Sequence, residues 1–490
     1  MSLLVLILIT SLLSALVYFV FFSNGSRTRE MNLPRGSMGY PVIGETLSFL
    51  KAQAKDEGPS WFEERIAEHG PVFKTSLMGS PTVVIMGQAG NKFIFTARED
   101  VLVPQQPLTL RTIAGKQNIS ELSGSRYRLV KGAMMNFLKP ESLQHSVKRM
   151  DEIIKNLFVR EVAKAGEGGD TIVKAVVFMK KLTFNVACDI LFGIKDESTE
   201  QALFDDFTMA FKAVWSLPIN LPGTEFWRGI KARSRIVDRI LPIMRERRKQ
   251  LERGTLRPGA DVVSCLLATR DENGEGFEEE AITDNFIILM IASHDTSAIL
   301  ASLMIWKLSK DPNIYDEVLQ EQMEVKRRKQ SRGGDGRLTW EDIQSMKFTW
   351  RVAQELMRII PPVFGNFKKA LQDLSFGGYD IPKGWQVFWA AYGTQMNGDI
   401  FENPDEFNPF RFDNPSKAKA IPPFTYVPFG AGVRMCPGNE FARVETLVIM
   451  HNLVTMYEWS QVNPEEAITR QPMPYPSMGL PIRLKPINTN

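Results

Sequence analysis

The sequence predicts a mainly α-helical domain with small β-sheets, preceded by a transmembrane helix. Residues 3–22 carry no charge over 20 positions, which is long enough to cross a bilayer as a helix. Residues 72–77 and 82–86 are rich in β-branched residues and flank Met78-Gly79-Ser80-Pro81, which predicts a hairpin. Beyond the hairpin the hydrophobic spacing is mostly helical.

Composition indicates one large globular unit and excludes several classes of function. The chain has 490 residues, 44% hydrophobic and 23% charged, without a compositional break. A net charge of +3 argues against a nucleic-acid-binding protein. The three cysteines and four histidines are scattered and lack metal-ligand spacing, so a metal held by side chains alone is not expected. A metal carried by a cofactor with one protein ligand fits this scarcity.

The N-terminal region predicts a membrane anchor. We assign residues 1–24 to the anchor, 25–45 to a linker and Pro/Gly-rich hinge, and 46–490 to a single large domain. Arg27, Arg29 and Arg35 follow the apolar run, so the positive-inside rule keeps the remainder in the cytosol. The chain would then span the membrane once, with its N-terminus in the lumen.

Local signals place several further elements. Residues 281–310 are apolar nearly all round, which predicts a buried helix. Residues 217–223 interrupt two helical runs, either as a plain loop or as an apolar surface at a bilayer or substrate entrance. Thr339 starts a helix through a capping pattern with Asp342. Residues 253–259 and 326–337 are expected to be polar loops.

A glycine-rich stretch, residues 429–438, carries the main chemical signal. Cys436 ends it, just before an amphipathic run at 441–450, so the sulfur is expected at a helix N-terminus, where the helix dipole favours a thiolate. A thiolate is a ligand for soft metals. Glycines allow the backbone to approach a flat partner, and Arg434 could reach an anionic group on it. The plain alternative is a buried cysteine in a flexible loop.

This stretch resembles the haem-binding signature F-x-x-G-x-R-x-C-x-G of the cytochromes P450 at every fixed position. The resemblance implies the cytochrome P450 fold, a helical haem-thiolate domain. It also implies that haem b is the cofactor and that Cys436 is the axial ligand of its iron. Phe429 would pack on the proximal face of the haem, beside Gly430.

A second motif lies inside the predicted buried helix. Residues 292–297, Ala-Ser-His-Asp-Thr-Ser, form a polar interruption whose side chains need partners. They resemble the family's oxygen-activation motif, in which the helix is locally opened. The resemblance makes Thr296 the hydrogen-bond donor toward bound dioxygen and Asp295 the gate to the proton supply. Ser293 replaces a usual Gly or Ala and is expected to bond the Leu289 carbonyl. The plain alternative is a satisfied polar pair.

Three residues resemble the structural charge network of the family. Glu355 and Arg358 match its E-x-x-R element, and Arg411 matches its P-x-R-F element, in the usual order and spacing. The resemblance implies a buried network that supports the cysteine loop, whereas the spacing alone would fit an ordinary surface pair. Gln395 departs from a His common in relatives, with no consequence that the sequence shows.

Basic residues are expected around the two haem carboxylates. Arg434 is the first candidate. The resemblance also aligns Tyr127 and Lys131 with a propionate-binding pair in which Trp or His and Arg are commoner, and Lys368 with a frequent Arg. Exposed basic residues are the alternative for Lys131 and Lys368.

Near-continuous blocks at 338–344, 361–365 and 381–385 look like the plant branch that contains triterpenoid oxidases, such as β-amyrin 28-oxidase, and taxane hydroxylases. The resemblance implies a monooxygenase that oxidises unactivated C–H bonds of a hydrophobic terpenoid with O2 and electrons from NADPH, delivered by NADPH-cytochrome P450 reductase. A hormone or sterol-like hydroxylase, an O2-independent isomerase and a scaffold without chemistry are the alternatives. By position in the family, substrate contacts fall on Arg111, Ile113, Ala292, Val363 and Met478, with core packing as the alternative for each.

Overall fold

The computed structural model describes residues 31–41, 43–166, 171–333, 335–413, 421–470 and 473–487. The predicted transmembrane segment, residues 3–22, lies outside them. Among the described residues, one helix, Glu279–Leu308, is long and apolar enough to span a membrane, and 83% of its most apolar window is buried inside the protein. Such burial is that of a core helix.

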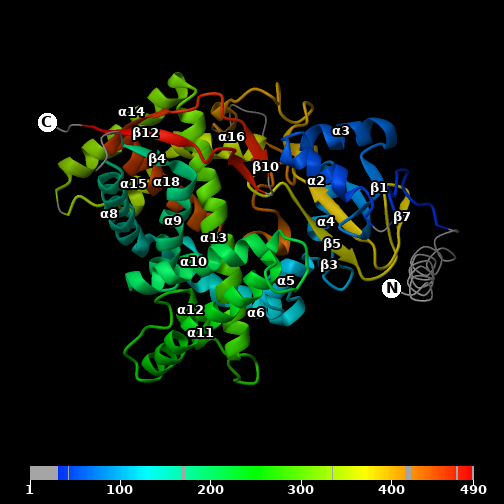
Figure 1. The fold of residues 1–490 in the computed structure, drawn as a ribbon, viewed down its shortest axis with the longest axis horizontal. Coiled ribbons are helices and arrows are strands. Elements are labelled where there is room, and N and C mark those ends of the chain that lie inside the picture. Colours follow the sequence, from blue (N-terminus) through cyan, green and yellow to red (C-terminus); the bar gives the residue numbers. More distant parts are fainter. Residues whose placement is uncertain are drawn as a thin grey trace, which may run out of the picture.

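Helices make up most of the molecule and lie largely to one side of the main sheet (Figure 1). This agrees with the predicted mainly helical fold. Their bounds are α2 (Thr46–Ala54), α3 (Gly58–His69), α4 (Gln88–Thr96), α5 (Leu108–Ala114), α6 (Gly124–Leu138), α7 (Pro140–Leu143), α8 (Val147–Gly166), α9 (Ala175–Val186), α10 (Glu197–Val214), α11 (Glu225–Glu252), α12 (Val262–Ala268), α13 (Glu279–Leu308), α14 (Pro312–Ser331), α15 (Trp340–Ser345), α16 (Lys347–Ile359), α17 (Tyr392–Gln395) and α18 (Asn439–Met456).

The strands form small sheets. The largest has the order β1-β2-β8-β5-β3, in which β2 and β8 are parallel and the other neighbours antiparallel. A three-stranded sheet has the order β4-β12-β9, and two hairpins pair β10 with β11 and β6 with β7. The bounds are β1 (Val72–Leu77), β2 (Ser80–Ile85), β3 (Leu102–Pro104), β4 (Ile172–Lys174), β5 (Gly365–Ala370), β6 (Leu374–Phe376), β7 (Tyr379–Ile381), β8 (Gln386–Ala390), β9 (Tyr457–Gln461), β10 (Ile468–Arg470), β11 (Pro474–Pro476) and β12 (Pro481–Pro486).

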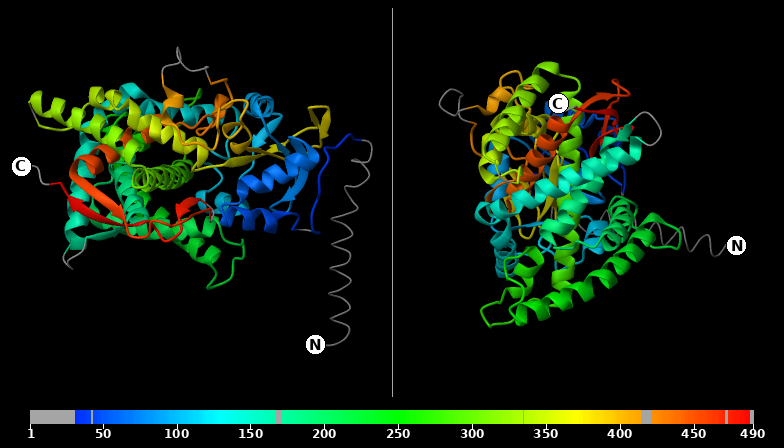
Figure 2. Two further views of the ribbon diagram at one scale, coloured as in Figure 1. Left: turned by 90° about the horizontal axis from the view of Figure 1, so that it is seen from above. Right: turned by 90° about the vertical axis from the view of Figure 1, so that its left-hand side faces the viewer.

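The helix α13 is the centre around which the helical part packs. It contacts α9, α11, α12, α16 and α18 as well as strand β11. The left view of Figure 2 looks nearly along it, with other helices around it. Acidic residues Glu279 and Glu280 lie in its first turn and Lys307 in its last, which complements the helix dipole. A helix that is apolar on every side is stable only in such a position.

Most local predictions are confirmed, and one is wrong. The 72–86 hairpin pairs Thr75 with Thr82 in register, α10 and α11 flank the 217–223 interruption, and Thr339 and Asp342 form the capping box. The loop expected at 326–337 is wrong in its first half, because α14 continues to Ser331. Its run of Lys, Arg and Gln residues has good helix propensity, which outweighs the charge pattern.

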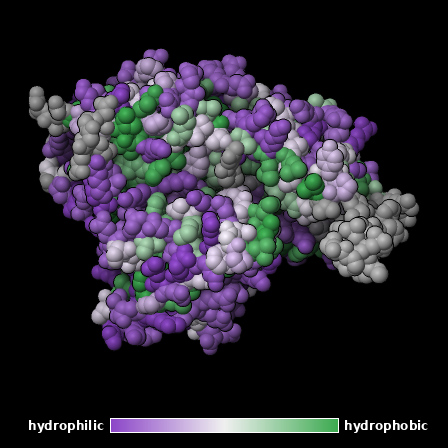
Figure 3. All heavy atoms as spheres, in the orientation of Figure 1, coloured by the Kyte–Doolittle hydropathy of each residue, from purple (hydrophilic) through white to green (hydrophobic). Residues whose placement is uncertain are grey.

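Part of the surface is apolar. Figure 3 shows apolar side chains gathered over α2 and over the loop between α10 and α11. The side chains of Leu47 on α2 and of Leu217 and Leu221 in the loop are 63%, 74% and 62% exposed. Exposed leucines gathered in this way mark a candidate contact surface.

Candidate functional site

A largely apolar cavity of about 450 Å³ lies between α13, strands β5 and β8, and the segment that carries Cys436. Cys436 lines it together with the preceding Phe429 and Gly430. Thr296 on α13 also lines it. The fold therefore brings the two sequence motifs, which are far apart along the chain, to the same cavity.

The cysteine segment is a tight loop that ends directly before α18. The amide of Cys436 donates to the carbonyl of Phe429 at 2.9 Å. Gly432 has φ +66°, and a Cβ there would lie 2.3 Å from the Phe95 carbonyl oxygen. No other residue fits this conformation and this contact. As predicted, the sulfur precedes a helix N-terminus, since α18 begins at Asn439.

The expected effect of the helix end on the thiol is outweighed by burial. Burial raises the pKa of the Cys436 thiol, and the Gly438 amide and the nearby Lys131 ammonium offset only part of that rise. The Gly438 amide at the helix end thus favours the thiolate, as predicted, while burial opposes it. A desolvated thiolate needs a strong positive partner, and a metal ion supplies one.

Three predicted cofactor contacts, Arg434, Tyr127 and Lys131, gather at the cysteine loop. The Arg434 guanidinium stacks on the Tyr127 ring at 3.6 Å and pairs with Glu99 at 2.6 Å. The Tyr127 hydroxyl donates to the Val433 carbonyl at 3.0 Å. Lys131 donates to the same carbonyl at 2.5 Å. These contacts brace the loop from α6, and the Glu99 partner was not predicted.

Lys368 is a further buried cation at the cavity wall. Its ammonium donates to the Ile94 carbonyl at 2.7 Å, and it lines the cavity with Arg434 and Tyr127. Burial, with a smaller contribution from Arg434, lowers the pKa of Lys368 to about 8. A cation desolvated in this way would be stabilised by an anion in the cavity.

On α13 the two motif residues face different surroundings. The Thr296 hydroxyl donates to the Ala292 carbonyl at 2.7 Å and lies at the cavity. Asp295 is absent from the cavity wall, with a side chain only 1% exposed, and it contacts Lys180 on α9 and Tyr475 on β11 instead. The acid and the hydroxyl thus lie on different sides of one helix.

The helix also differs from expectation at Ser293. Its hydroxyl donates to the Met290 carbonyl at 3.4 Å, one residue nearer than the Leu289 carbonyl that we expected. The His294 ring nitrogen contacts the same carbonyl at 2.7 Å. The helix runs unbroken from Glu279 to Leu308, without the local opening implied by the resemblance. The reason is that these side chains bond back onto the helix rather than replace its ladder.

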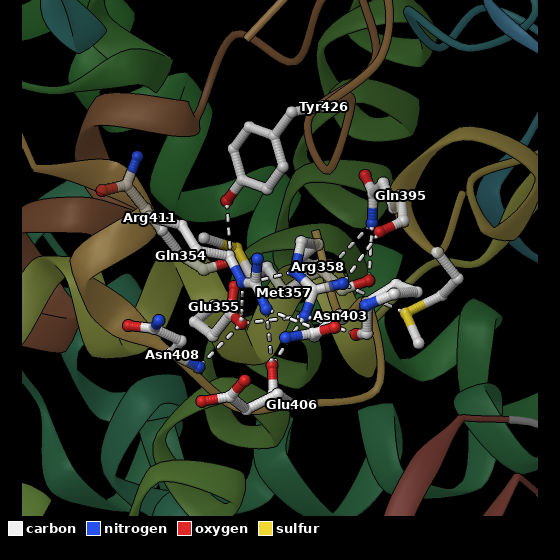
Figure 4. A network of polar contacts seen from close by, with 12 residues as sticks. Gln354, Glu355, Met357, Arg358, Gln395, Asn403, Glu406, Asn408, Arg411 and Tyr426 are labelled. Carbon is white, nitrogen blue, oxygen red and sulfur yellow. Dashed lines mark hydrogen bonds and ion pairs between the residues drawn. The ribbon is translucent and has the colours of Figure 1, made fainter. Parts of the chain in front are cut away.

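Figure 4 shows Glu355, Arg358 and Arg411 converging. The Glu355 carboxylate accepts two bonds from Arg358, both 2.8 Å, and one of 3.1 Å from Arg411. It also accepts the Asn408 amide at 2.9 Å. The side chains of Glu355 and Arg358 are completely buried. The surface-pair alternative is therefore excluded.

Gln395 extends this network toward the cysteine loop. Its amide nitrogen donates to the Met357 and Arg358 carbonyls at 3.0 Å each, and its oxygen accepts the Val427 amide at 3.0 Å. Nearby, the Tyr426 hydroxyl donates to the Gln354 carbonyl at 3.0 Å (Figure 4). These links tie the end of α16 to the residues that lead to Cys436. This role of Gln395 could not be predicted from the sequence, because its partners are distant along the chain.

The five candidate substrate contacts divide into two groups. Ala292 and Val363 line the cavity. Arg111 points to an ion pair with Glu121 at 3.0 Å, Ile113 is fully buried in the core, and Met478 is 57% exposed. These three do not line the cavity and are corrected here, because family position alone does not fix the direction of a side chain.

Comparison with known proteins decides the family. Residues 34–485 match the family model described as cytochrome P450. The chain belongs to the cytochrome P450 family. It is 38% identical to the beta-amyrin 28-monooxygenase of Medicago truncatula, covering 98% of both chains, and 34% identical to the taxane 13-alpha-hydroxylase of Taxus cuspidata, covering 96% of both. The retinoic acid-bound cyanobacterial CYP120A1 superposes with a TM-score of 0.82 at 28% identity, covering 94% of this chain and all of that one. The predicted family and fold are thereby confirmed, and this cytochrome P450 is a monooxygenase.

Membership of the family implies a haem iron, and the residues present fit that group. Cys436 offers a single sulfur ligand at the cavity, and no group of three or more His, Cys, Asp or Glu side chains in the described ranges could hold a metal by itself. Arg434 and Lys368 line the same wall and suit two carboxylates. Burial lowers the pKa of Lys368, and a carboxylate bound beside its ammonium would raise that pKa again.

Proposed function

We propose that this cytochrome P450 hydroxylates, or oxidises further, unactivated C–H bonds of a hydrophobic terpenoid. Triterpenoids and diterpenoids are the candidate substrates. The observation that carries the proposal is a largely apolar cavity lined by both Cys436 and Thr296. The names of the relatives, which act on beta-amyrin and taxanes, support the same class. Electrons would come from NADPH through NADPH-cytochrome P450 reductase, and the oxidant would be O2.

The chain's own residues would share the remaining tasks. Cys436 would hold the haem iron, and Arg434 and Lys368 its carboxylates. When bound, the haem supplies the dioxygen-activating and C–H-oxidising chemistry. Apolar walls exclude bulk water and orient the substrate, while Thr296, whose hydroxyl now donates to a helix carbonyl, could turn to hold a proton toward the cavity. Asp295 would supply that proton.

We further propose a membrane-bound protein, with residues 1–24 as the anchor, 25–45 as the hinge and 46–490 as the cytosolic catalytic domain in the endoplasmic reticulum. The exposed leucines of α2 and of the loop before α11 support this location, because they form an apolar surface beside one another (Figure 3). Such a surface is suited to the boundary of a bilayer. Flotation of the full chain with microsomes, compared with residues 46–490 alone, tests the anchor.

Product analysis tests the catalytic proposal. The full chain is co-expressed with a plant reductase in microsomes and supplied with a panel of triterpenes, diterpenes and sterols. The expected result is an NADPH-dependent product heavier by one oxygen from a terpene. Turnover without NADPH would establish an isomerase instead, and oxidation of sterols alone would move the substrate class.

A spectrum tests the cofactor ligand separately. The reduced protein with carbon monoxide should show the red-shifted Soret absorption typical of thiolate ligation. Cys436→Ala should lose that absorption. Purified wild-type protein without bound haem, expressed with ample haem supply, would contradict the assignment and favour a scaffold protein.

A further inference from the structure

Two primary amides lie opposite one another on one wall of the cavity. Strands β3 and β5 pair antiparallel, and just beyond β3 the Gln105 amide donates to the Phe367 carbonyl at 3.0 Å, which continues the same register. The next residue, Gln106, is therefore opposite Asn366, and both line the cavity. Opposed side chains of an antiparallel pair stand close together on one face. We call Gln106 and Asn366 the amide pair.

The amide pair has hydrogen-bonding capacity that the protein does not use. The oxygen Oδ1 of Asn366 accepts the Phe367 amide at 2.7 Å, which leaves the NH2 group of Asn366 as a donor. Among the described residues, no group bonds this NH2 group or either end of the Gln106 side-chain amide. A primary amide carries two N–H donors and one carbonyl acceptor. The pair therefore offers donors and an acceptor to a molecule in the cavity.

Other uncharged polar side chains at the cavity have partners within the protein. The hydroxyls of Ser293 and Thr296 donate to carbonyls of their own helix, α13. The hydroxyl of Ser120 donates to the side chain of Asn118. Hydroxyls that bond back onto nearby groups in this way are less available to a ligand. The amide pair is thus the better candidate for a polar contact with the substrate.

The charge of the pair distinguishes its ligand from the haem. The cations Lys368 and Arg434 line the same cavity and suit the haem carboxylates, because charge-assisted hydrogen bonds are stronger than neutral ones. Gln106 and Asn366 are neutral, so they match an uncharged oxygen. A hydroxyl satisfies both residues, since it accepts a bond from the Asn366 NH2 group and donates one to the Gln106 carbonyl.

A pure hydrocarbon would leave the amide pair unsatisfied. The rest of the cavity wall is largely apolar, and a bulky terpene that fills the cavity displaces water from the wall. An amide that loses its water and gains no partner is costly. A hydroxyl placed against the pair removes this cost. A site built to bond a hydroxyl therefore discriminates against the analogue that lacks one.

We propose that Gln106 and Asn366 are specificity-determining residues that bind a hydroxyl already present on the terpenoid. The substrate is then a terpene alcohol rather than a terpene hydrocarbon. A reaction that introduces oxygen, either an oxygenation or a hydration, must precede this one. The bound hydroxyl orients the skeleton in a cavity that otherwise offers mostly apolar contacts. This inference rests on the proposed function, because it names a feature of the substrate proposed there.

Binding of matched ligands tests the amide pair without turnover. The probes are a triterpene alcohol and a diterpene alcohol, each with the hydrocarbon that has hydrogen in place of the hydroxyl, and a sterol with its deoxy counterpart. Dissociation constants for the full-length, haem-loaded protein are measured by displacement of an azole that ligates the haem iron. The wild type should bind a terpene alcohol at least about tenfold more tightly than its hydrocarbon.

Leucine variants locate the source of that preference. Gln106→Leu and Asn366→Leu replace the amides by apolar groups of similar volume. Each should reduce the preference for the alcohol to about threefold or less, because the hydroxyl loses a partner and the hydrocarbon no longer leaves that amide unpaired. Gln105→Leu is the matched control, since it makes the same change at the neighbouring residue, which does not line the cavity. It should keep the wild-type preference.

Two kinds of result would overturn the inference. One is an equal affinity of the wild type for each alcohol and its hydrocarbon, or a preference that both leucine variants retain. The other is loss of the reduced carbon monoxide spectrum in both variants but not in Gln105→Leu, which would assign the pair to a haem carboxylate. If only Asn366→Leu loses haem, the preference measured in Gln106→Leu decides.

The probes separate this inference from the proposed function. If terpenes bind but the alcohol and the hydrocarbon bind equally, the inference fails and the proposed substrate class stands. If only the sterol binds, and the leucine variants remove its advantage over its deoxy counterpart, the proposed substrate class fails while the amide pair still binds a hydroxyl. Failure of every probe to displace the azole would overturn both.

Discussion

Removal of the Glu355 carboxylate should be among the most damaging single changes outside the cavity. Glu355→Ala leaves the buried Arg358 and the largely buried Arg411 without the anion that both contact. Breaking a buried ion pair from one side costs about 3–5 kcal/mol. For a unit of this size ~1 kcal/mol shifts the melting temperature by about 1 °C. The expected loss is therefore about 3–5 °C, together with loss of haem from the purified protein.

The chain contains a matched control for this experiment. Glu440 and Arg443 form another Glu–Arg pair at the same spacing, with a contact of 2.6 Å, but both side chains are about one-fifth exposed. Partly exposed pairs contribute about 1 kcal/mol or less. Melting is followed by circular dichroism, and haem by the reduced carbon monoxide spectrum. Equal shifts in Glu355→Ala and Glu440→Ala, or full haem content in Glu355→Ala, would refute the reasoning.

Three further changes test other parts of the structure. Burial raises the pKa of Glu445 to about 8, so the folded state binds more protons than the unfolded state between about pH 4.5 and 8. The free energy of unfolding should therefore fall as pH rises through this window, by roughly 5 kcal/mol in the limit. Melting curves should show a weaker fall in Glu445→Gln, and identical pH dependences in the two proteins would contradict the burial argument. Gln395→Leu removes the hydrogen-bond partners of three buried backbone groups. It should lower the free energy of unfolding, measured with denaturant, by about 3 kcal/mol or more. A loss no greater than that of an exposed Gln→Leu change would argue against the role of Gln395 in joining α16 to the segment before Cys436. Gly432→Ala places a Cβ 2.3 Å from a carbonyl oxygen, so it should lower the melting temperature and abolish the carbon monoxide signal. Gly438→Ala should lower the melting temperature less, because the backbone of Gly438 lies outside the left-handed region. A larger loss in Gly438→Ala than in Gly432→Ala would refute the steric argument.

The sequence predicted the elements that depend on neighbouring residues. The hairpin, the capping box at Thr339 and the buried α13 all follow from patterns within a few turns of chain. The 326–337 loop failed for a related reason. The loop prediction rested on the charge of four consecutive basic residues, 326–329. Lys and Arg are also good helix formers, and α14 includes these residues and continues to Ser331.

Contacts between distant segments could not be predicted in the same way. The family resemblance placed Glu355, Arg358 and Arg411 in one group, but nothing in the sequence joins Gln395 to the Val427 amide. The contacts of Asp295 with Lys180 and Tyr475 are also outside the reach of a motif, because these partners lie far from it along the chain, one on either side. Burial, too, depends on the whole fold, so the sequence did not show that desolvation raises the pKa of the Cys436 thiol.

The arrangement of α13 explains how one apolar helix serves two purposes. The residues facing the cavity near the motif are small or weakly polar, Ala292, Ser293 and Thr296, which leaves space beside Cys436. The ionisable side chain, Asp295, lies on another face, where α9 and β11 provide a cation and a hydroxyl. A carboxylate kept permanently in the cavity would meet an apolar, water-poor wall at high cost. Holding it outside, one residue before Thr296, lets the same helix keep the cavity wall apolar.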